Sequence, residues 1–92
     1  MLRTMITDTP SEQKWTLQGR LCGEWAADLK EQWEAMRSTR ESRRCSVDLE
    51  DVNCVDSQGE SVLLQMASEG AVFLASRAYM KHVLESLKEH QQ

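Results

Sequence analysis

The residues with the most chemical potential lie in one acidic run, from Asp48 to Glu60. The run contains three aspartates, Asp48, Asp51 and Asp56, followed directly by Ser57. Converging carboxylates could bind a hard cation, and free N–H groups at a helix start could hold an anion or a phosphorylated hydroxyl. However, the run has no histidine and no second ligand cluster. We therefore expect no metal site and no cofactor, and interpret the aspartates as solvated loop acids.

Ser57 and Glu60 have the S-x-x-E spacing of a capping box, in which both side chains bond to backbone N–H groups at a helix start. This structural interpretation is favoured over an anion-binding loop. Acid–base or nucleophilic catalysis is disfavoured because His82 and His90 lie in the last helical segment, away from Ser57 and the cysteines. We expect both histidines at the surface, no catalytic residue and no enzymatic activity.

The cysteines are odd in number and match no C-x-x-C pattern: Cys22, Cys45 and Cys54. Neither a disulfide framework nor a zinc site is indicated, so we interpret them as reduced, small, buried side chains. Four of the eleven basic residues fall within eight positions: Arg37, Arg40, Arg43 and Arg44. They could form a patch for an acidic partner or a nucleotide phosphate, but a solvated linker is favoured.

Hydrophobic periodicity predicts the elements that would position these residues. Residues 1–7 are weakly extended, 7–13 have turn chemistry, and 15–21 alternate between apolar and polar, which is typical of a hairpin strand. Helical spacing over 24–38 predicts an amphipathic helix. Its expected buried stripe consists of Trp25, Leu29, Trp33 and Met36.

The second half of the chain continues the alternation of strand and helix. A polar link over 38–44 leads to a short strand at 45–49, and a helix is expected from Ser57 to near Gly70. The continuous apolar run 71–75 predicts a buried central or parallel strand.

A last helix should follow, with Ser76 as its N-cap and a frayed tail at 89–92. Its inner side should carry Tyr79 or Met80, Val83, Leu84 and Leu87. The order β-β-α-β-α-β-α predicts an α/β fold with a mixed, mostly parallel four-stranded sheet and flanking helices. We expect one domain over 1–92, with its core at about 2–88.

Composition narrows the classes of function. With 92 residues, 28% charged and 40% apolar, the chain is typical of a folded soluble domain, and a net charge of −4 argues against nonspecific nucleic-acid binding. Its longest apolar run, 71–75, is far short of the ~20 residues that span a bilayer. Because residues 1–10 lack the apolar region of a secretory signal, we expect a cytoplasmic protein. A homodimer is left open.

The charge is unevenly distributed. Between Cys45 and Ser76 there are six acids and no lysine or arginine, whereas the remainder of the chain carries a net charge of +2. We therefore expect a basic partner surface and an association that slows as salt rises.

Four stretches carry a family resemblance: Leu17-Gln18-Gly19-Arg20-Leu21, Val47-Asp48-Leu49 with Val52, Val55-Asp56-Ser57-Gln58-Gly59, and Leu63-Leu64 followed by Gly70. Their order and spacing resemble the STAS domain of sulphate transporters and anti-sigma factor antagonists. The resemblance covers about residues 2–88. It implies a small mixed sheet flanked by helices and a binding module in place of an enzyme.

In bacterial anti-sigma factor antagonists, the loop at this helix start docks on an anti-sigma factor that is also a serine kinase, and the residue before the glycine is phosphorylated. Here that position is Gln58, which cannot accept phosphate, so the chain is either a constitutive binder or is modified at Ser57 or Ser61. The resemblance implies a partner-binding loop that includes Asp48, Asp51, Asp56, Ser57, Gln58, Gly59 and Glu60.

The resemblance implies a role in transcription regulation, through binding of the anti-sigma factor, and gives the residues of the Asp56-Ser57-Gln58-Gly59 motif separate parts in it. Asp56 would shape the loop, Ser57 would cap the helix or take a phosphate, and Gly59 would let a partner's backbone approach. The resemblance also supports an alternative, a small cytoplasmic STAS subunit of a lipid-transport ABC complex, which braces the ATPase and needs no phosphorylation cycle.

Overall fold

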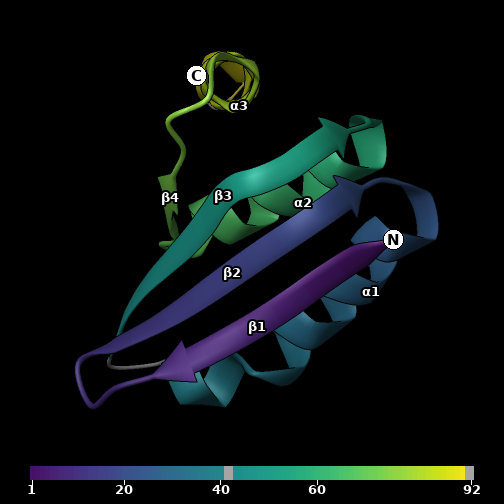
Figure 1. The fold of residues 1–92 in the computed structure, drawn as a ribbon. Helices are drawn as coiled ribbons and strands as arrows, with labels where there is room; N and C mark the ends of the chain where they lie inside the picture. The colour runs from purple at the N-terminus through teal and green to yellow at the C-terminus, as the bar shows by residue number, and fades with distance from the viewer. Residues whose placement is uncertain (41–42, 91–92) are drawn as a thin grey trace.

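An antiparallel hairpin opens the fold, made of β1 (Leu2–Asp8) and β2 (Glu12–Leu21) (Figure 1). The computed structural model describes residues 1–40 and 43–90. The hairpin turn is shorter than the predicted 7–13, because β2 already begins at Glu12. Strand alternation extends over the whole of β2 and turns Trp15 and Leu17 into the core.

The remaining elements follow in the predicted order, with one short 3-10 helix added. They are α1 (Gly23–Ala35), η1 (Arg37–Arg40), β3 (Arg44–Val55), α2 (Ser57–Ser68), β4 (Val72–Leu74) and α3 (Ala78–His90). Of the expected polar link over 38–44, residues 41–42 lie outside the described part of the chain, and its beginning forms η1. α3 continues through residues 89 and 90, which were expected to be frayed, whereas 91–92 are not described.

The four strands form one sheet in the order β1-β2-β3-β4. β1 runs antiparallel to β2, whereas β3 runs parallel to both β2 and β4. The sheet is therefore mixed and not mostly parallel as predicted, since the long β1–β2 pair is antiparallel and the β3–β4 pair spans only three positions.

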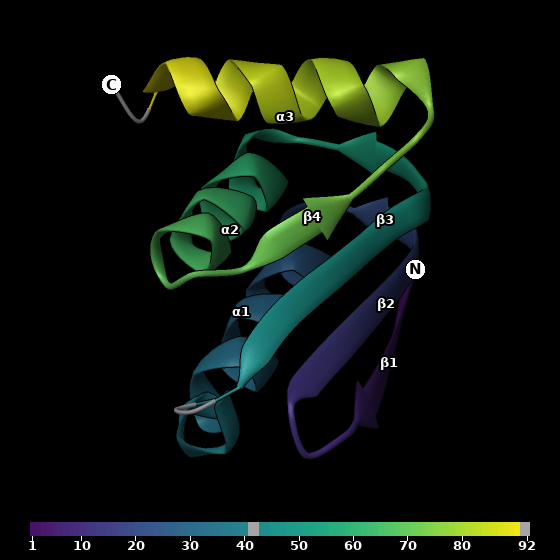
Figure 2. The ribbon, with the colours of Figure 1, turned by 90° about the vertical axis from the view of Figure 1, so that its left-hand side faces the viewer.

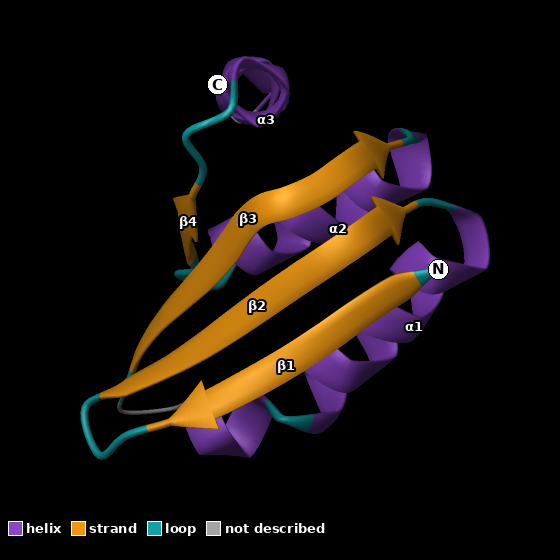
Figure 3. Cartoon of the chain, viewed as in Figure 1, coloured by secondary structure: helices purple, strands orange, loops and turns teal. Residues whose placement is uncertain are grey.

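The helices cover the sheet unequally. α1 and α2 lie side by side behind the sheet in Figure 1, and α3 crosses the end of α2 and β3 (Figure 2). The opposite face of the sheet carries no helix from residues 1–40 or 43–90 (Figure 3). The fold thus has a helical face and an open sheet face.

The core lies between the sheet and helices α1 and α2, which lie side by side behind it. At its centre Trp15 of β2 meets Trp33 of α1, with ring centroids 5.4 Å apart. Burying a large apolar side chain stabilises a fold by about 1.5–3 kcal/mol relative to leaving it exposed. Gln13 is also fully buried; its Oε1 accepts a hydrogen bond from Trp15 Nε1 at 2.7 Å.

The predicted buried stripe of α1 is wrong in one member. Trp25 is 37% exposed, and Ala26, Leu29 and Trp33 face the core instead. These three residues follow the i, i+3, i+7 spacing of one helix face, and Trp25, four positions before Leu29, lies at the edge of that face. Met36 packs against the core as the C-cap of the helix.

The strand predicted at 71–75 is parallel to its neighbour β3, but it is neither central nor buried. β4 is a three-residue edge strand, and its Val72 and Leu74 side chains are 53% and 43% exposed. Only one neighbouring strand pairs with it, so its apolar run is not enclosed on both sides. Ser76 does not cap α3; its hydroxyl donates to Glu50 Oε2 at 2.5 Å.

The inner side of α3 follows the predicted spacing. Met80, Val83 and Leu87 are buried, and Leu84 packs against the core from a half-buried position. Tyr79 is 46% exposed, so Met80 is the inward residue of the predicted pair.

Candidate functional site

The candidate site is built around one carboxylate at the start of α2. Asp56 is the N-cap, and its Oδ1 accepts a hydrogen bond from Gly59 N–H at 2.8 Å. Its Oδ2 accepts a second bond, at 2.9 Å, from the N–H of Gly23, the first residue of α1. The hydrogen bonds from Gly59 and Gly23 lower the pKa of Asp56. A single side chain therefore joins the starts of both helices.

This geometry corrects the predicted cap. Ser57 is the first residue inside α2, and the cap is Asp56, one position earlier. From the N-cap position the Asp56 carboxylate accepts from the N–H of Gly59, the third helical residue, which is the donor that an N-cap oxygen satisfies. The Ser57 side chain is exposed.

Gly59 also has a role different from the expected one. It is buried, and a Cβ built on it would lie 2.2 Å from the carbonyl oxygen of Leu21 and 2.9 Å from Val55 Cγ1. The absent side chain lets α2 approach the end of β2 within the chain itself. Gly59 is therefore inaccessible to a partner's backbone, contrary to the prediction.

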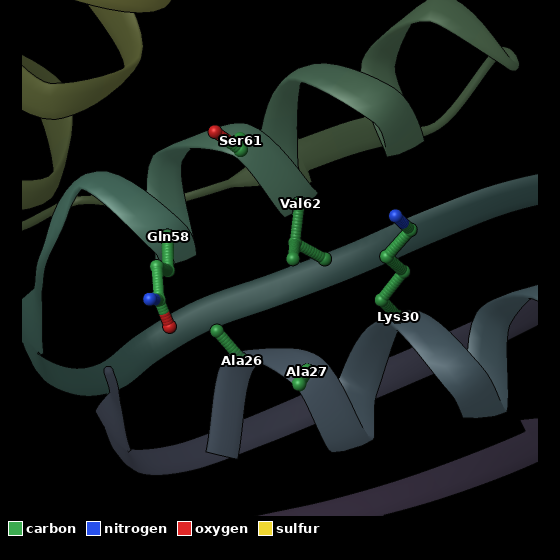
Figure 4. Close-up of a pocket in the computed structure, with 6 residues that line it drawn as sticks. All are labelled: Ala26, Ala27, Lys30, Gln58, Ser61 and Val62. Carbon is green, nitrogen blue, oxygen red and sulfur yellow. The ribbon is translucent and has the colours of Figure 1, made fainter. Parts of the chain in front are cut away.

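Gln58 lies at the surface between these two structural residues. Its side chain is exposed and lines a groove of about 370 Å³ between α1 and α2. In Figure 4, Gln58 and Val62 from α2 point toward α1, whose Ala26 points back toward Gln58. Small side chains on α1 leave room for the groove.

Sequence reasoning missed the α1 side of this groove, which is lined by Ala26, Ala27 and Lys30. These residues lie about thirty positions before Gln58, and only the packing of α1 beside α2 brings them together. The available signal in the sequence was the consecutive pair Ala26-Ala27. A buried apolar stripe does not require two small residues in a row, whereas a groove beside a helix does.

The three aspartates of the acidic run do not converge. Asp48 lies within β3, pairs with Thr16 and forms an ion pair with Lys14 at 3.8 Å on the open sheet face. Asp51 is also a β3 residue, because this strand continues to Val55 and does not end at 49. Only Asp56 reaches the start of α2. Asp48 and Asp51 therefore lie away from the groove that Gln58 lines.

A second carboxylate, Glu69, joins the end of α2 to the end of α1. Its Oε1 accepts from Trp33 Nε1 at 3.2 Å and from Arg40 Nη2 at 3.3 Å. Burial alone would raise the pKa of Glu69, but its hydrogen bonds and the nearby arginines outweigh burial and lower it. Gln65 of α2 also donates to Glu34 of α1 at 3.1 Å.

Three of the four clustered arginines have partners within the chain, so the cluster forms neither the open patch nor the solvated linker considered above. The Arg40 guanidinium lies 3.6 Å from the centroid of the Trp33 ring and also donates to the Trp33 carbonyl. Arg37 forms an ion pair with Glu69 at 3.5 Å, and Arg43 forms one with Asp8 at 2.5 Å. Arg44 is exposed.

The cysteines differ from one another. Cys45 is buried as predicted, and burial raises the pKa of its thiol. Cys22 and Cys54 are half-buried, and their sulfurs lie 3.2 Å apart. No spacing rule in the sequence indicates this contact, because the parallel pairing of β2 and β3 creates it.

The helical face is acidic. α1 carries Glu24, Asp28, Glu31 and Glu34 against a single lysine, and α2 adds Glu60 with no base.

Across residues 1–40 and 43–90, no group of three or more His, Cys, Asp or Glu side chains is placed to hold a metal ion. Within the same described residues, no helix is long and apolar enough to cross a membrane. His82 is exposed on α3, and the side chain of His90 lies outside the described ones.

A scan against protein-family models finds no match for this chain, and a search of curated proteins finds no significant relative.

Proposed function

We propose that this chain is a non-enzymatic, STAS-like protein-interaction module of the anti-sigma factor antagonist type, present in the cytoplasm. Its docking surface is the first turn of α2 together with the groove between α1 and α2. The partner is an anti-sigma factor that is also a serine kinase. The four-stranded mixed sheet, with an antiparallel first strand and helices behind it, supports this proposal.

The observation that carries the proposal is the position of Gln58. Its neighbours Asp56 and Gly59 are engaged within the chain, whereas Gln58 is exposed and directed into a groove. An uncharged, hydrogen-bonding side chain at the rim of an acidic helical face suits a contact that a phosphate or carboxylate would disturb. The site is therefore complementary to a basic partner in its unmodified form.

Ser57 and Ser61 are the remaining hydroxyls near this position. Both are exposed, but the Ser61 hydroxyl already donates to the Ser57 carbonyl at 3.1 Å. Phosphate on Ser57 would lie at the N-terminus of α2, where negative charge favours the helix. Incubation with the cognate kinase and ATP, followed by intact mass measurement, should leave the chain unmodified if it is a constitutive binder.

The test of the docking surface is the substitution Gln58→Asp. We expect at least roughly tenfold weaker partner binding, because aspartate is one methylene shorter than glutamine, cannot donate the hydrogen bonds of the Gln58 amide, and must lose its hydration in the interface. The matched control is Gln32→Asp, which places the same change on an exposed α1 position that does not line the groove. Equal affinities for the two variants would move the interface elsewhere; circular dichroism checks that both fold.

The alternative is a small STAS subunit of a lipid-transport ABC complex, which the lack of a phosphorylatable residue at position 58 favours. Purification of the tagged chain from its source cells separates the two functions. A histidine-kinase-like ATPase among the captured proteins supports the anti-sigma pathway, and an ABC ATPase supports the transporter role.

A further inference from the structure

Two thiols meet where the ends of β2 and β3 lead into α1 and α2. Cys22 follows the last residue of β2 and is the N-cap of α1, whereas Cys54 lies near the end of β3. Their sulfur atoms are 3.2 Å apart, although 32 positions separate them in the chain. Forming a disulfide from this arrangement requires the sulfurs to approach by only about 1 Å more.

The backbone around the pair is already tied together. Asp56 N–H donates to the carbonyl of Leu21 at 3.4 Å, and the Asp56 side chain accepts from Gly23 N–H. These contacts use the residues on either side of Cys22, and the β2–β3 pairing places Arg20 opposite Cys54, so the chain segments that would be cross-linked are held side by side. Both thiols are half-buried and therefore within reach of a small reagent.

We propose that Cys22 and Cys54 form a redox modification site that closes to an intramolecular disulfide in the presence of an oxidised low-molecular-weight thiol such as oxidised glutathione. One protein thiolate attacks the small disulfide, forms a mixed disulfide and releases one small thiol. The second protein thiol then attacks the protein sulfur of the mixed disulfide and releases the other. Two electrons and two protons pass from the protein to the small disulfide, which becomes two thiols.

The surroundings favour the reduced pair as the resting form. The hydrogen bond between the two thiols raises the pKa of Cys22, and its partial burial and the Asp56 carboxylate act in the same direction. A thiol kept protonated reacts slowly, because the thiolate is the nucleophile. The pair is thus suited to equilibration with a thiol–disulfide pool over long exposure and not to rapid capture of an oxidant.

The cross-link would act on the element that positions Gln58. It would join the residue before α1 to a residue two positions before Asp56, the carboxylate that links both helix starts. The site does not depend on the proposed docking function, because its chemistry can be measured on the isolated chain.

The experiment equilibrates the purified full-length chain with mixtures of reduced and oxidised glutathione, quenches with acid and alkylates the remaining thiols under denaturing conditions. In oxidising mixtures we expect a monomer that has lost two hydrogens and takes up one alkyl group, with peptide mapping that links Cys22 to Cys54. Addition of a phosphine reductant should restore three alkylated thiols. The oxidised chain should unfold at a higher urea concentration than the reduced one.

Single variants provide the controls. Cys45→Ala keeps the pair and should oxidise like the wild type, whereas Cys22→Ser and Cys54→Ser should form no intramolecular cross-link. The proposal is overturned if all three wild-type thiols remain alkylatable, if a mixed glutathione disulfide is the stable product, or if the cross-link joins two chains. Mapping of the wild type decides the question even where a variant fails to fold.

Discussion

Replacing Gly59 with alanine places a methyl group against the backbone of β2. The new Cβ would lie 2.2 Å from the carbonyl oxygen of Leu21, well inside the 3.4 Å at which ordinary van der Waals contact begins. The same atom would lie 2.9 Å from Val55 Cγ1. A side chain such as Val55 can rotate away, but a strand carbonyl cannot, so the start of α2 must move outward.

The size of the effect follows from two opposing contributions. Overpacking of a well-packed interior destabilises a fold by about 1–3 kcal/mol. Alanine is a better helix former than glycine by about 1 kcal/mol, which offsets part of this. Because the obstacle is backbone, we take the upper part of the overpacking range and expect a net loss of about 2 kcal/mol. For a domain of this size, this corresponds to a melting temperature lower by roughly 8–16 °C.

Urea unfolding followed by tryptophan fluorescence measures this loss, since Trp15 and Trp33 are fully buried. Ser68→Ala is the matched control, because Ser68 is exposed near the end of the same helix and should change the free energy of unfolding by less than about 0.5 kcal/mol. If Gly59→Ala unfolds at the same urea concentration as Ser68→Ala, α2 does not pack closely on β2, and the structural role given to Gly59 is refuted.

Two further predictions use the same unfolding assay. Gln13→Leu removes the buried acceptor of Trp15 Nε1 and should lower the free energy of unfolding by about 1–3 kcal/mol; an unchanged transition would mean that this N–H finds another partner. Asp56→Asn should show a pH-dependent loss. Because the pKa of Asp56 is lowered in the folded state, its carboxylate stabilises the fold above its unfolded pKa of about 3.9, and this contribution disappears as pH falls through the lower folded value. The difference between wild type and Asp56→Asn should therefore be constant near neutral pH and shrink in acid, and a difference independent of pH would contradict the hydrogen bonds to Gly23 and Gly59.

Local periodicity was sufficient to predict the hairpin and the order of the elements, and the S-x-x-E spacing located the start of α2 at Ser57, although its cap is Asp56. It failed where the outcome depends on how elements pack. The burial of Trp25 depended on the phase of α1, and the structure turns Ala26 to the sheet instead. The burial of Val72 depended on the position of β4 in the sheet, which places it at an edge.

The candidate site was predicted in part for the same reason. The sequence places Asp56 and Gln58 at a helix start, and the structure does the same. The position of Asp48 was set by strand pairing, which turns it toward Lys14 on the open face. The contact between Cys22 and Cys54 also depends on strand register, and no short-range pattern encodes it.

The helices α1 and α2, which form the groove, are joined by Asp56 at their starts and by the Glu69–Trp33 contact near their ends. The spacing of the two helices is therefore set before any partner arrives, and the flexible side chains among those that line the groove are Lys30 and Gln58. A preorganised groove loses little conformational entropy on association, so more of the contact energy appears as affinity. Calorimetry of a complex at several temperatures should accordingly show a small unfavourable entropy from ordering of the chain. Structures of the free and bound chains should show the same backbone in both helices.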